Sequence, residues 1–330
     1  MTGGIPVGRG ARAPGPGRTG PRVVALGGGH GLAATLRALR RVTDDVTAVV
    51  AVSDDGGSSG RLRQEFDVVP PGDLRMALAA LCGDDTWGRT WSRVVQHRFA
   101  GTGDLAGHSL GNLLITAMWE ETGDIVTGLD WVGALLGAHG RVLPVATRPL
   151  QVVADVAGLH PDDPTLLERV VGQVQVATTR GEVVGLHLEP ADAEACPAAV
   201  EAIEVADALV LGPGSWFTSV LAPLQVTGIG RAVLEAQGRV IVVLNLAPQP
   251  GETDGFSPQR HLEVLAAQMP GLRVDTVLAD PAGVRDVNAL ATAATALGAR
   301  LALAPVASRD GTPRHDVDLL ASALGGVLTT

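Results

Sequence analysis

The sequence predicts a doubly wound α/β fold, in which helices cover both faces of a mostly parallel sheet and a small β-rich insertion interrupts the middle of the chain. Three observations predict it. A strand, a glycine loop, a helix and a second strand follow one another within residues 22–52, which is the pattern of a βαβ unit with parallel strands. The same alternation returns after residue 208. Between these parts, short β-prone segments are separated by turn residues.

The first unit has the clearest pattern. Residues 22–26 (RVVAL) are apolar and β-branched and end in glycines, which predicts a buried strand. Residues 32–41 carry apolar side chains at helical spacing and arginines in the last turn, where a helix dipole favours cations. Residues 46–52 (VTAVVAV) predict the second strand. Further helices are expected near residues 73–82, 92–99, 110–121 and 125–138.

The insertion is expected at about residues 148–190, as an antiparallel sheet or sheet edge. Its strands are expected at residues 150–157, 170–178 and 183–188. Later strands are expected at residues 208–211, 239–246, 274–278 and 301–306, and later helices at residues 218–224, 230–237, 258–268 and 316–324.

We expect one domain over residues 21–330. Residues 1–20 are rich in glycine, proline and arginine, which predicts a disordered tail rather than a signal peptide.

Composition excludes several classes of function. The chain has 25 basic residues, all of them arginine, against 35 acidic residues, so its net charge is −10. Without lysine there is no P-loop lysine and no Schiff base, and a net negative chain is a poor partner for nucleic acid. Cys82 and Cys196 lie far apart, which indicates a reducing compartment and a cytoplasmic location. The sequence has no uncharged apolar run of about 18 residues, so no membrane span is expected.

The first candidate site is the glycine loop after the first strand. Residues 27–31 read GGGHG, and such glycines let backbone N–H groups approach an anion at the start of the next helix. The dinucleotide fingerprint G-x-G-x-x-G/A fails here. Counted from Gly27 its last position is Leu32, and counted from Gly28 its second glycine is His30. We therefore expect a nucleotide or phosphate loop without NAD geometry. The alternative is a tight turn that binds nothing.

The second candidate site follows the second strand, where residues 53–61 read SDDGGSSGR. Asp54 is placed to accept hydrogen bonds from ribose or sugar hydroxyls. Asp54 and Asp55 together are an alternative site for a hydrated Mg²⁺ beside a substrate phosphate. Ser58 and Ser59, with Arg61, supply donors for an anion. An ordinary solvated turn has the same composition, and composition does not choose between sugar and metal.

Two later strand ends carry similar signals. Residues 212–215 (GPGS) join a strand to a helix, with Gly214 and Ser215 as candidate phosphate contacts and Ser215 also as a natural N-cap. Asn245 ends a very apolar strand, and its amide is suited to read a base or sugar edge. Residues 250–255 (PGETDG) contain two candidate acids, Glu252 and Asp254, but are equally typical of a surface turn.

One histidine is a weaker candidate. His108 lies in the segment GHSLGN, which opens a helix with Ser109 as its expected cap. It suits a general acid or base or a phosphate donor, and a histidine whose partners are the local backbone is an equal alternative. The eight histidines show no HExxH spacing and no cluster with cysteine, and no Ser/His/Asp constellation is recognisable. Zinc catalysis and serine hydrolysis are therefore not expected.

Several motifs occur together in one order: VVALGGGHGL, AVSDDGGSSGRLR, PPGDLRMALAAL, GHSLGNLL, GPGSWFTS and QPGETDGF. From residue 22 to residue 261 the chain resembles the gluconeogenesis factor family, the YvcK-type branch of the CofD-like superfamily. The late segment RHD at residues 314–316 resembles a C-terminal motif of that family. The resemblance implies a Rossmann-like α/β sandwich. His30 stands where the family usually has threonine in its glycine loop.

The resemblance also implies roles for matching positions. The backbone and short side chains of the two glycine loops would contact phosphates, namely Gly28, Gly29, His30, Gly31, Gly214 and Ser215, with Ser58 and Ser59 beside them. Asp54 and Asn245 would orient the sugar or the base. Arg314 is a candidate for a charged contact to the diphosphate.

Two functions follow from this resemblance. The first is a cytoplasmic protein that binds a UDP-sugar, such as UDP-N-acetylglucosamine or UDP-glucose, and supports cell shape and cell-wall synthesis during gluconeogenic growth, with or without turnover. The second is a transferase that moves a phospholactyl group from a nucleoside diphosphate to an alcohol with Mg²⁺, with Asp54 or His108 near the acceptor hydroxyl. The failed fingerprint disfavours an NAD-dependent oxidoreductase. The assembly state, a homo-oligomer included, stays open.

Overall fold

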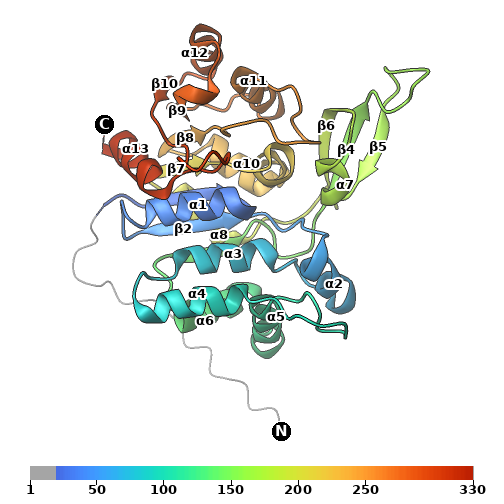
Figure 1. The fold of residues 1–330 in the computed structure, drawn as a ribbon, viewed down its shortest axis with the longest axis vertical. Coiled ribbons are helices and arrows are strands. Elements are labelled where there is room, and N and C mark those ends of the chain that lie inside the picture. Colours follow the sequence, from blue (N-terminus) through green and yellow to red (C-terminus); the bar gives the residue numbers. More distant parts are fainter. Residues whose placement is uncertain (1–19, 330) are drawn as a thin grey trace.

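The computed structural model of the chain describes residues 20–329, so the tail expected at residues 1–20 lies almost wholly outside the described residues. At its centre is a seven-stranded sheet in the order β10-β9-β8-β7-β1-β2-β3 (Figure 1). Every neighbouring pair in it is parallel. The predicted doubly wound, mostly parallel sheet is therefore confirmed. The strands of this sheet are β1 (Val23–Gly27), β2 (Val46–Val50), β3 (Arg141–Pro144), β7 (Ala208–Leu211), β8 (Arg239–Val243), β9 (Thr276–Ala279) and β10 (Arg300–Leu303).

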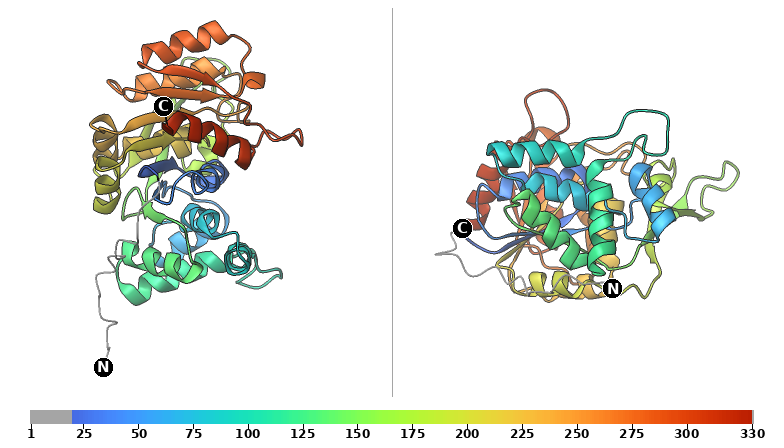
Figure 2. Two further views of the ribbon diagram at one scale, coloured as in Figure 1. Left: turned by 90° about the vertical axis from the view of Figure 1, so that its left-hand side faces the viewer. Right: turned by 90° about the horizontal axis from the view of Figure 1, so that it is seen from below.

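Helices cover both faces of this sheet. Figure 2 (left) shows α1 and α13 on one face and α10 on the other. The helices of the first half are α1 (Gly29–Leu39), α2 (Gly57–Phe66), α3 (Gly72–Leu81), α4 (Thr86–Gln96), α5 (Leu110–Thr122) and α6 (Ile125–Leu136). Those of the second half are α7 (Gln173–Ala177), α8 (Pro197–Glu204), a π-helix (Trp216–Leu221), α9 (Ala222–Gln225), α10 (Thr227–Leu234), α11 (Pro258–Gln268), a 3₁₀-helix (Pro281–Gly283), α12 (Val287–Ala296) and α13 (Val317–Thr329).

The central strands are unbroken apolar runs because both of their faces are covered. Every residue of β1, β7 and β9 is buried, as expected for a parallel sheet between two helical layers. The largest fully buried side chains are Trp216 and Phe217, in the π-helix that follows β7. This packing fixes the chain directly after β7, where one of the predicted loops lies.

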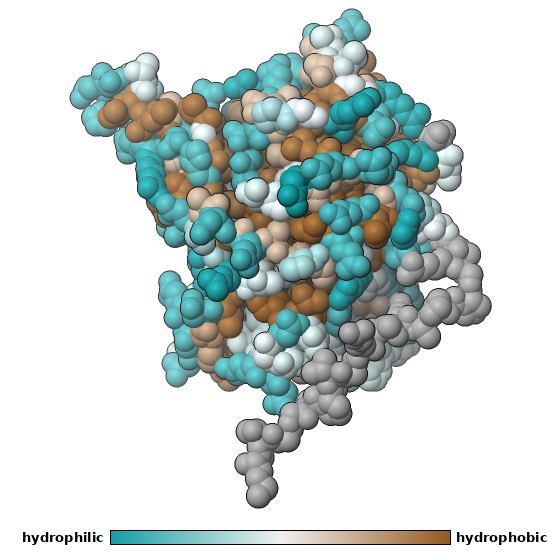
Figure 3. All heavy atoms as spheres, turned by 180° about the vertical axis from the view of Figure 1, so that it is seen from behind, coloured by the Kyte–Doolittle hydropathy of each residue, from teal (hydrophilic) through white to brown (hydrophobic). Residues whose placement is uncertain are grey.

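The insertion is a separate three-stranded antiparallel sheet in the order β5-β4-β6. Its strands are β4 (Gln151–Ala157), β5 (Glu168–Val171) and β6 (Glu182–Glu189), within the stretch predicted for the β-rich insertion. It projects from the edge of the sheet near α2 (Figure 1). Hydrophobic residues gather on it in the view from behind (Figure 3). Its exposed apolar residues are Leu166, Leu167, Val171, Val174 and Val184.

Several local predictions were wrong. The strand expected at residues 170–178 ends at Val171, and the short helix α7 follows it. The segment at residues 53–61, interpreted as a loop, begins helix α2 at Gly57. Strand β3 and helices α8 and α12 were not predicted. The two expected caps occupy the right positions, but neither Ser109 nor Ser215 makes a side-chain capping hydrogen bond.

Among the described residues, no single helix has the length and apolar composition needed to cross a membrane. Among these residues, the two helical segments Trp216–Gln225 and Thr227–Leu234 reach that length and apolar composition only when taken together, and the chain bends by 87° between them.

Candidate functional site

The winding direction of the sheet reverses between β1 and β7. From β1 the chain continues to β2 and β3 on one side, whereas β7 leads to β8, β9 and β10 on the other. Ligands of doubly wound sheets bind beyond the carboxyl ends of the strands at such a point. The two predicted glycine loops, residues 27–31 after β1 and residues 212–215 after β7, lie there side by side because β1 and β7 are paired.

The two glycine loops touch through their backbones. A Cβ atom built on Gly31 would lie only 2.2 Å from the carbonyl oxygen of Pro213 and 2.8 Å from the Cα of Gly214. The hydroxyl of Thr35, one turn further along α1, donates to the carbonyl of Gly212 at 3.2 Å. Gly29 has φ +61°, a left-handed conformation that glycine adopts at little cost. The loops thus form one continuous backbone surface at the start of α1.

Side chains that follow β8 hold the second loop in place. The amide of Asn245 accepts from Gly214 N at 3.0 Å and donates to Gly214 O at 2.8 Å. Gln249 accepts from Trp216 N at 3.2 Å, and its amide nitrogen lies 3.4 Å from the hydroxyl of Ser215. The predicted candidate Asn245 therefore lies at the site, with its amide already bonded to the loop backbone.

The two candidate acids of residues 250–255 also bond to the backbone. The buried carboxylate of Glu252 accepts from the N–H groups of Phe217 and Thr218, each at 2.9 Å, while its burial raises its pKa. Asp254 accepts from Gly251 N at 2.8 Å and closes the turn. Both side chains support loops at this edge of the sheet.

On the β2 side, a compact polar cluster faces the first glycine loop. A Cβ on Gly72 would lie 2.3 Å from the hydroxyl oxygen of Ser59 and 2.9 Å from Oδ2 of Asp54. A Cβ on Gly28 would lie 2.4 Å from Oδ2 of Asp73. The start of α3 therefore brings Asp73 between the predicted residue Asp54 and the glycine loop. Sequence reasoning missed Asp73, although the motif PPGDLRMALAAL contains it.

The carboxyl group of Asp73 is electrostatically unusual. Burial, followed by the negative charge of Asp54, raises its pKa to about 7, against the opposing effects of a hydrogen bond from Gly29 and the charge of Arg75. Two adjacent carboxylates at low solvent exposure favour a proton or a cation between them. The pair Asp54 and Asp73 thus suits a hydrated Mg²⁺ that also contacts a phosphate. No group of three or more metal-binding side chains occurs among the described residues.

Asp55 has a different partner from Asp54. Its Oδ1 accepts from Val174 N at 3.1 Å, at the start of helix α7 in the insertion. A Cβ on Gly172 would lie 2.5 Å from its Oδ2. The side chain therefore ties the loop after β2 to the insertion. For a Mg²⁺ site the geometry favours Asp54 with Asp73 rather than the predicted pair Asp54 and Asp55.

Ser58 begins a buried polar network at the start of α2. Its hydroxyl lies 3.0 Å from Nδ1 of His108 and accepts from the amide of Asn112 at 3.1 Å. Asn112 in turn accepts from Nε of Arg75 at 2.9 Å, and Arg75 donates to Gln96. The predicted candidates Ser58 and His108 are thus in direct contact, and the network links them to α3 and α5.

The ring of His108 is held in its neutral form near pH 7. Burial lowers its pKa, the positive charge of Arg61 lowers it further, and only Glu65 raises it appreciably. A neutral imidazole can accept a proton, so the chemistry expected of a general base is available to it. The structure also gives it a purely structural role, since one ring nitrogen already bonds to Ser58.

The last two predicted site residues, His30 and Arg314, lie at the margins of the candidate site. His30 is exposed in the first turn of α1. Arg314 is exposed on the segment between β10 and α13. The next residue, His315, is half-buried, and desolvation of its ring lowers its pKa to about 4 although it bonds to the backbone of Leu244, just after β8. This contact brings the Arg314 segment toward Asn245, but the guanidinium makes no hydrogen bond or ion pair within residues 20–329.

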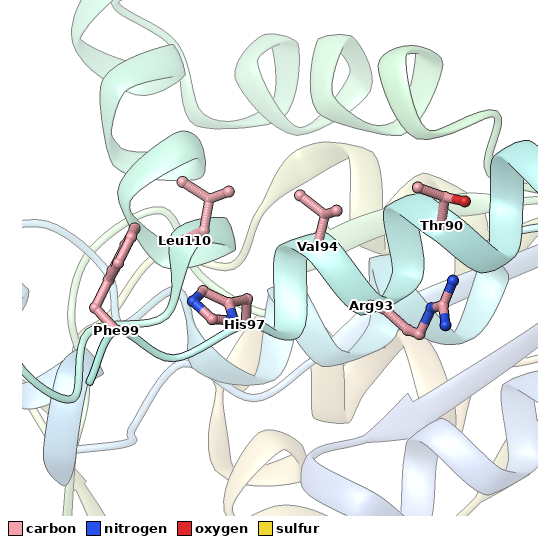
Figure 4. A pocket seen from close by; sticks show the side chains of 6 residues that line it. All are labelled: Thr90, Arg93, Val94, His97, Phe99 and Leu110. Atoms are coloured by element: carbon pink, nitrogen blue, oxygen red, sulfur yellow. The ribbon is translucent and has the colours of Figure 1, made fainter.

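Two cavities of about 400 Å³ each lie away from these residues. One is nearly apolar and is formed by α4, the start of α5 and the segment between them (Figure 4). The other lies at the ends of α1 and α3 that point away from the glycine loops. Neither is lined by a predicted site residue, so the candidate site is identified by the switch point and its polar groups.

Comparison with known proteins agrees with this layout. The family model described as 2-phospho-L-lactate transferase CofD matches residues 23–299. The chain belongs to the CofD family. A Mycobacterium tuberculosis protein assigned to the gluconeogenesis factors is 53% identical to this chain over 308 residues. The match covers 92% of this chain and 90% of that protein. The gluconeogenesis factor of Listeria monocytogenes is 33% identical over 94% of this chain and 96% of its own length.

The fold is shared with solved structures. Two crystal structures of a UPF0052 family protein from Bacillus halodurans superpose on this CofD family chain with a TM-score of 0.83. They are 32% and 33% identical to it and cover 95% and 94% of it, with all of their own length matched. The gluconeogenesis factor resemblance seen in the sequence is therefore confirmed at the level of family and fold.

Proposed function

We propose that this chain binds a nucleoside diphosphate sugar at the switch point between β1 and β7, and that the ligand is a UDP-sugar such as UDP-N-acetylglucosamine or UDP-glucose. The protein acts in the cytoplasm as a binding and regulatory factor that supports cell shape and cell-wall synthesis during gluconeogenic growth. Relatives named as gluconeogenesis factors support the link to gluconeogenic growth. The two buried free thiols, Cys82 and Cys196, support a reducing compartment.

The observation that carries the proposal is the backbone contact between the two glycine loops. The absence of a side chain at Gly29 leaves the start of α1 open to an anion, and its absence at Gly31 lets the second loop close against the first. The loop at Gly214 and Ser215 adds a second wall from the neighbouring strand. A diphosphate is the part of a sugar nucleotide that such a cradle would hold, since it needs several convergent N–H donors.

Polar groups on either side of the cradle would hold the remaining parts of the ligand. Asp54 and Ser59 lie together on the β2 side, where a carboxylate and a hydroxyl suit sugar or ribose hydroxyls. Asn245 lies on the β8 side, where the base would pass. Arg314 would contact the diphosphate from the segment that His315 anchors beside Leu244.

Calorimetric titration with UDP-N-acetylglucosamine, UDP-glucose, NAD⁺ and GDP tests the ligand class. We expect a UDP-sugar to bind, and at 100 times its Kd to stabilise the fold by about 2.7 kcal/mol. Asp54→Asn should weaken binding roughly 10- to 150-fold, because a charged hydrogen bond contributes about 1.5–3 kcal/mol. Asp67→Asn, at the exposed far end of α2, is the matched control. Binding of NAD⁺ alone would contradict the proposal.

A second function has its own supporting observations. The matching family model is described as a 2-phospho-L-lactate transferase, and the carboxylates of Asp54 and Asp73 suit Mg²⁺. Bound there, the metal would supply charge neutralisation at the phosphoryl group. The residues of the chain would position an acceptor hydroxyl for attack on phosphorus, while neutral His108 or a carboxylate accepts its proton and the nucleoside monophosphate leaves.

The metal separates the two functions. If Asp54→Asn weakens nucleotide binding only when Mg²⁺ is present, and a deazaflavin alcohol is converted to product, the transferase is the function. If the loss is the same with a chelator and no product forms, Asp54 contacts hydroxyls and the binding function holds. An unchanged affinity under both conditions, in a folded variant, removes Asp54 from the site.

A further inference from the structure

A second cavity, of about 400 Å³, lies at the opposite end of α1 from the glycine loops. It opens between the last turns of α1 and α3, the first half of α4 and the start of α13, on the side of the molecule seen in Figure 2 (left). Because α1 rises about 1.5 Å per residue, its 11 residues place this cavity roughly 16 Å from Gly29. It is therefore separate from the proposed nucleotide site.

The walls of this cavity are strongly basic in a chain whose net charge is −10. Five arginines line it against a single acidic residue, Asp84. The hydrogen bond from Arg40, with the charges of Arg41 and Arg89, lowers the pKa of the Asp84 carboxyl. The five are Arg37, Arg40, Arg41, Arg89 and Arg93.

Only part of this positive charge is neutralised by the protein. Arg40 pairs with Asp84 at 2.5 Å and Arg41 pairs with Asp318. Arg89 donates to the main-chain carbonyl of Asp84 and forms no salt bridge with a carboxylate among residues 20–329. That leaves three guanidinium charges without a carboxylate.

Two of these guanidinium groups are not bonded within the described residues at all. Neither Arg37 nor Arg93 forms a side-chain hydrogen bond or ion pair there. The Nε of Arg40 is buried without a hydrogen-bond partner, although a buried N–H donor normally has one. The cavity therefore contains both unneutralised charge and an unsatisfied donor.

We propose that this cavity is a second ligand site, for a small anion that carries two phosphoryl groups. A diphosphate carries about three negative charges near pH 7, which matches the three guanidinium groups without carboxylate partners. The planar fork of arginine bonds two phosphate oxygens at once. The volume lies in the range of small-molecule sites, and the small side chains of Ala79 and Ala80 leave room beside the arginines.

Titration calorimetry with inorganic pyrophosphate at constant ionic strength tests the proposal. We expect pyrophosphate to bind and the double variant Arg37→Ala with Arg93→Ala to lose at least about 10-fold in affinity. Arg273→Ala, which removes an exposed arginine far along the chain, should bind as the wild type does. Glucose 1,6-bisphosphate is the second probe. Its binding, lost in the same double variant, identifies a sugar-linked source of the two phosphoryl groups, and its failure to bind identifies the inorganic anion.

Two further arms keep the result unambiguous. Gly29→Ala places a methyl group on the glycine loop at φ +61°, which strains alanine, so its Tm is measured first. The folded variant should keep pyrophosphate binding while it loses UDP-sugar affinity. Arg93→Glu changes an exposed side chain, so it tests the charge even if the double variant does not fold. Pyrophosphate binding that survives Arg93→Glu and the double variant, or that is lost in Gly29→Ala, overturns the proposal.

Discussion

Replacing Gly31 with alanine tests whether the two glycine loops form one binding surface. A Cβ at this position would lie 2.2 Å from the carbonyl oxygen of Pro213, 2.6 Å from its carbonyl carbon and 2.8 Å from the Cα of Gly214. All three are backbone atoms, which cannot rotate away as a side chain does. The loops must separate by about 1 Å before ordinary contacts of about 3.5 Å are restored.

The magnitude follows from two opposing effects. Alanine stabilises a helical position by about 0.5–1 kcal/mol relative to glycine, whereas overpacking a tight contact costs about 1–3 kcal/mol. We expect a net loss of roughly 1–2 kcal/mol. With an unfolding entropy of about 2.1 cal/mol/K per residue, that loss lowers the Tm by roughly 1.5–3 °C. Affinity for UDP-N-acetylglucosamine should fall more than about 10-fold, because displaced N–H groups no longer converge on the diphosphate.

Differential scanning calorimetry and titration calorimetry measure the two effects separately. Gly133→Ala is the matched control, since its Cβ would lie 3.7 Å from the side chain of Leu78, an ordinary contact in the middle of α6. It should keep or raise the Tm and leave affinity unchanged. A wild-type Tm and affinity in Gly31→Ala would refute the close contact. A lowered Tm with wild-type affinity would refute the shared binding surface.

Three further outcomes are expected. The pKa of Asp73 is raised to about 7, so between about pH 4 and 7 the folded state keeps a proton that the unfolded state releases, and the free energy of unfolding falls as the pH rises. Urea unfolding in EDTA should therefore show a flatter pH dependence for Asp73→Asn than for the wild type. Equal pH dependence in the two proteins contradicts this prediction. Ser58→Ala leaves His108 and Asn112 without a buried partner and should cost about 1–3 kcal/mol in chemical denaturation; an unchanged midpoint argues against the network. Asp55→Ala should speed hydrogen exchange of the α7 amides but not of β1, since it removes the bond to Val174; unchanged exchange in α7 refutes the tie.

The sheet could be predicted, and the candidate site proposed, because both depend on local sequence signals. Buried strands such as residues 22–26 and 46–52 are unbroken apolar runs, and glycine and short polar residues mark the ends of the strands that carry the site. β1, β2 and β7 were accordingly found close to their predicted bounds.

Helix α2 was missed because its sequence contradicts helix propensity. It begins GSSG, and Leu62 is its single fully buried large apolar residue, so no amphipathic period is visible. Tertiary packing decides the conformation instead. A Cβ on Gly60 would lie 2.1 Å from the carbonyl oxygen of Asp55, so the close turn requires glycine at this point in the helix.

Asp73 and Gln249 were missed for a different reason. An acidic residue in the first turn of a helix ordinarily stabilises the helix dipole, so Asp73 carries no signal that it faces Asp54 across the loop. Gln249 lies in a proline-rich segment typical of a surface turn. The role of Gln249 arises from the pairing of β7 with β8, and that of Asp73 from the packing of α3 beside the paired strands β1 and β2.

The two proposed sites recognise phosphate by different means, and salt should distinguish them. The cradle of the two glycine loops offers mainly backbone dipoles at the start of α1, with one guanidinium, Arg314, whereas the cavity at Arg37 and Arg93 is lined by five arginines. The Debye length falls from about 30 Å at 0.01 M salt to about 10 Å at 0.1 M, so screening acts chiefly on the second site. Over that range pyrophosphate affinity should fall steeply while UDP-sugar affinity changes little. If the two affinities depend on salt in the same way, one set of charges governs the binding of both ligands. The proposal that the two ends of α1 bind different ligands would then be wrong.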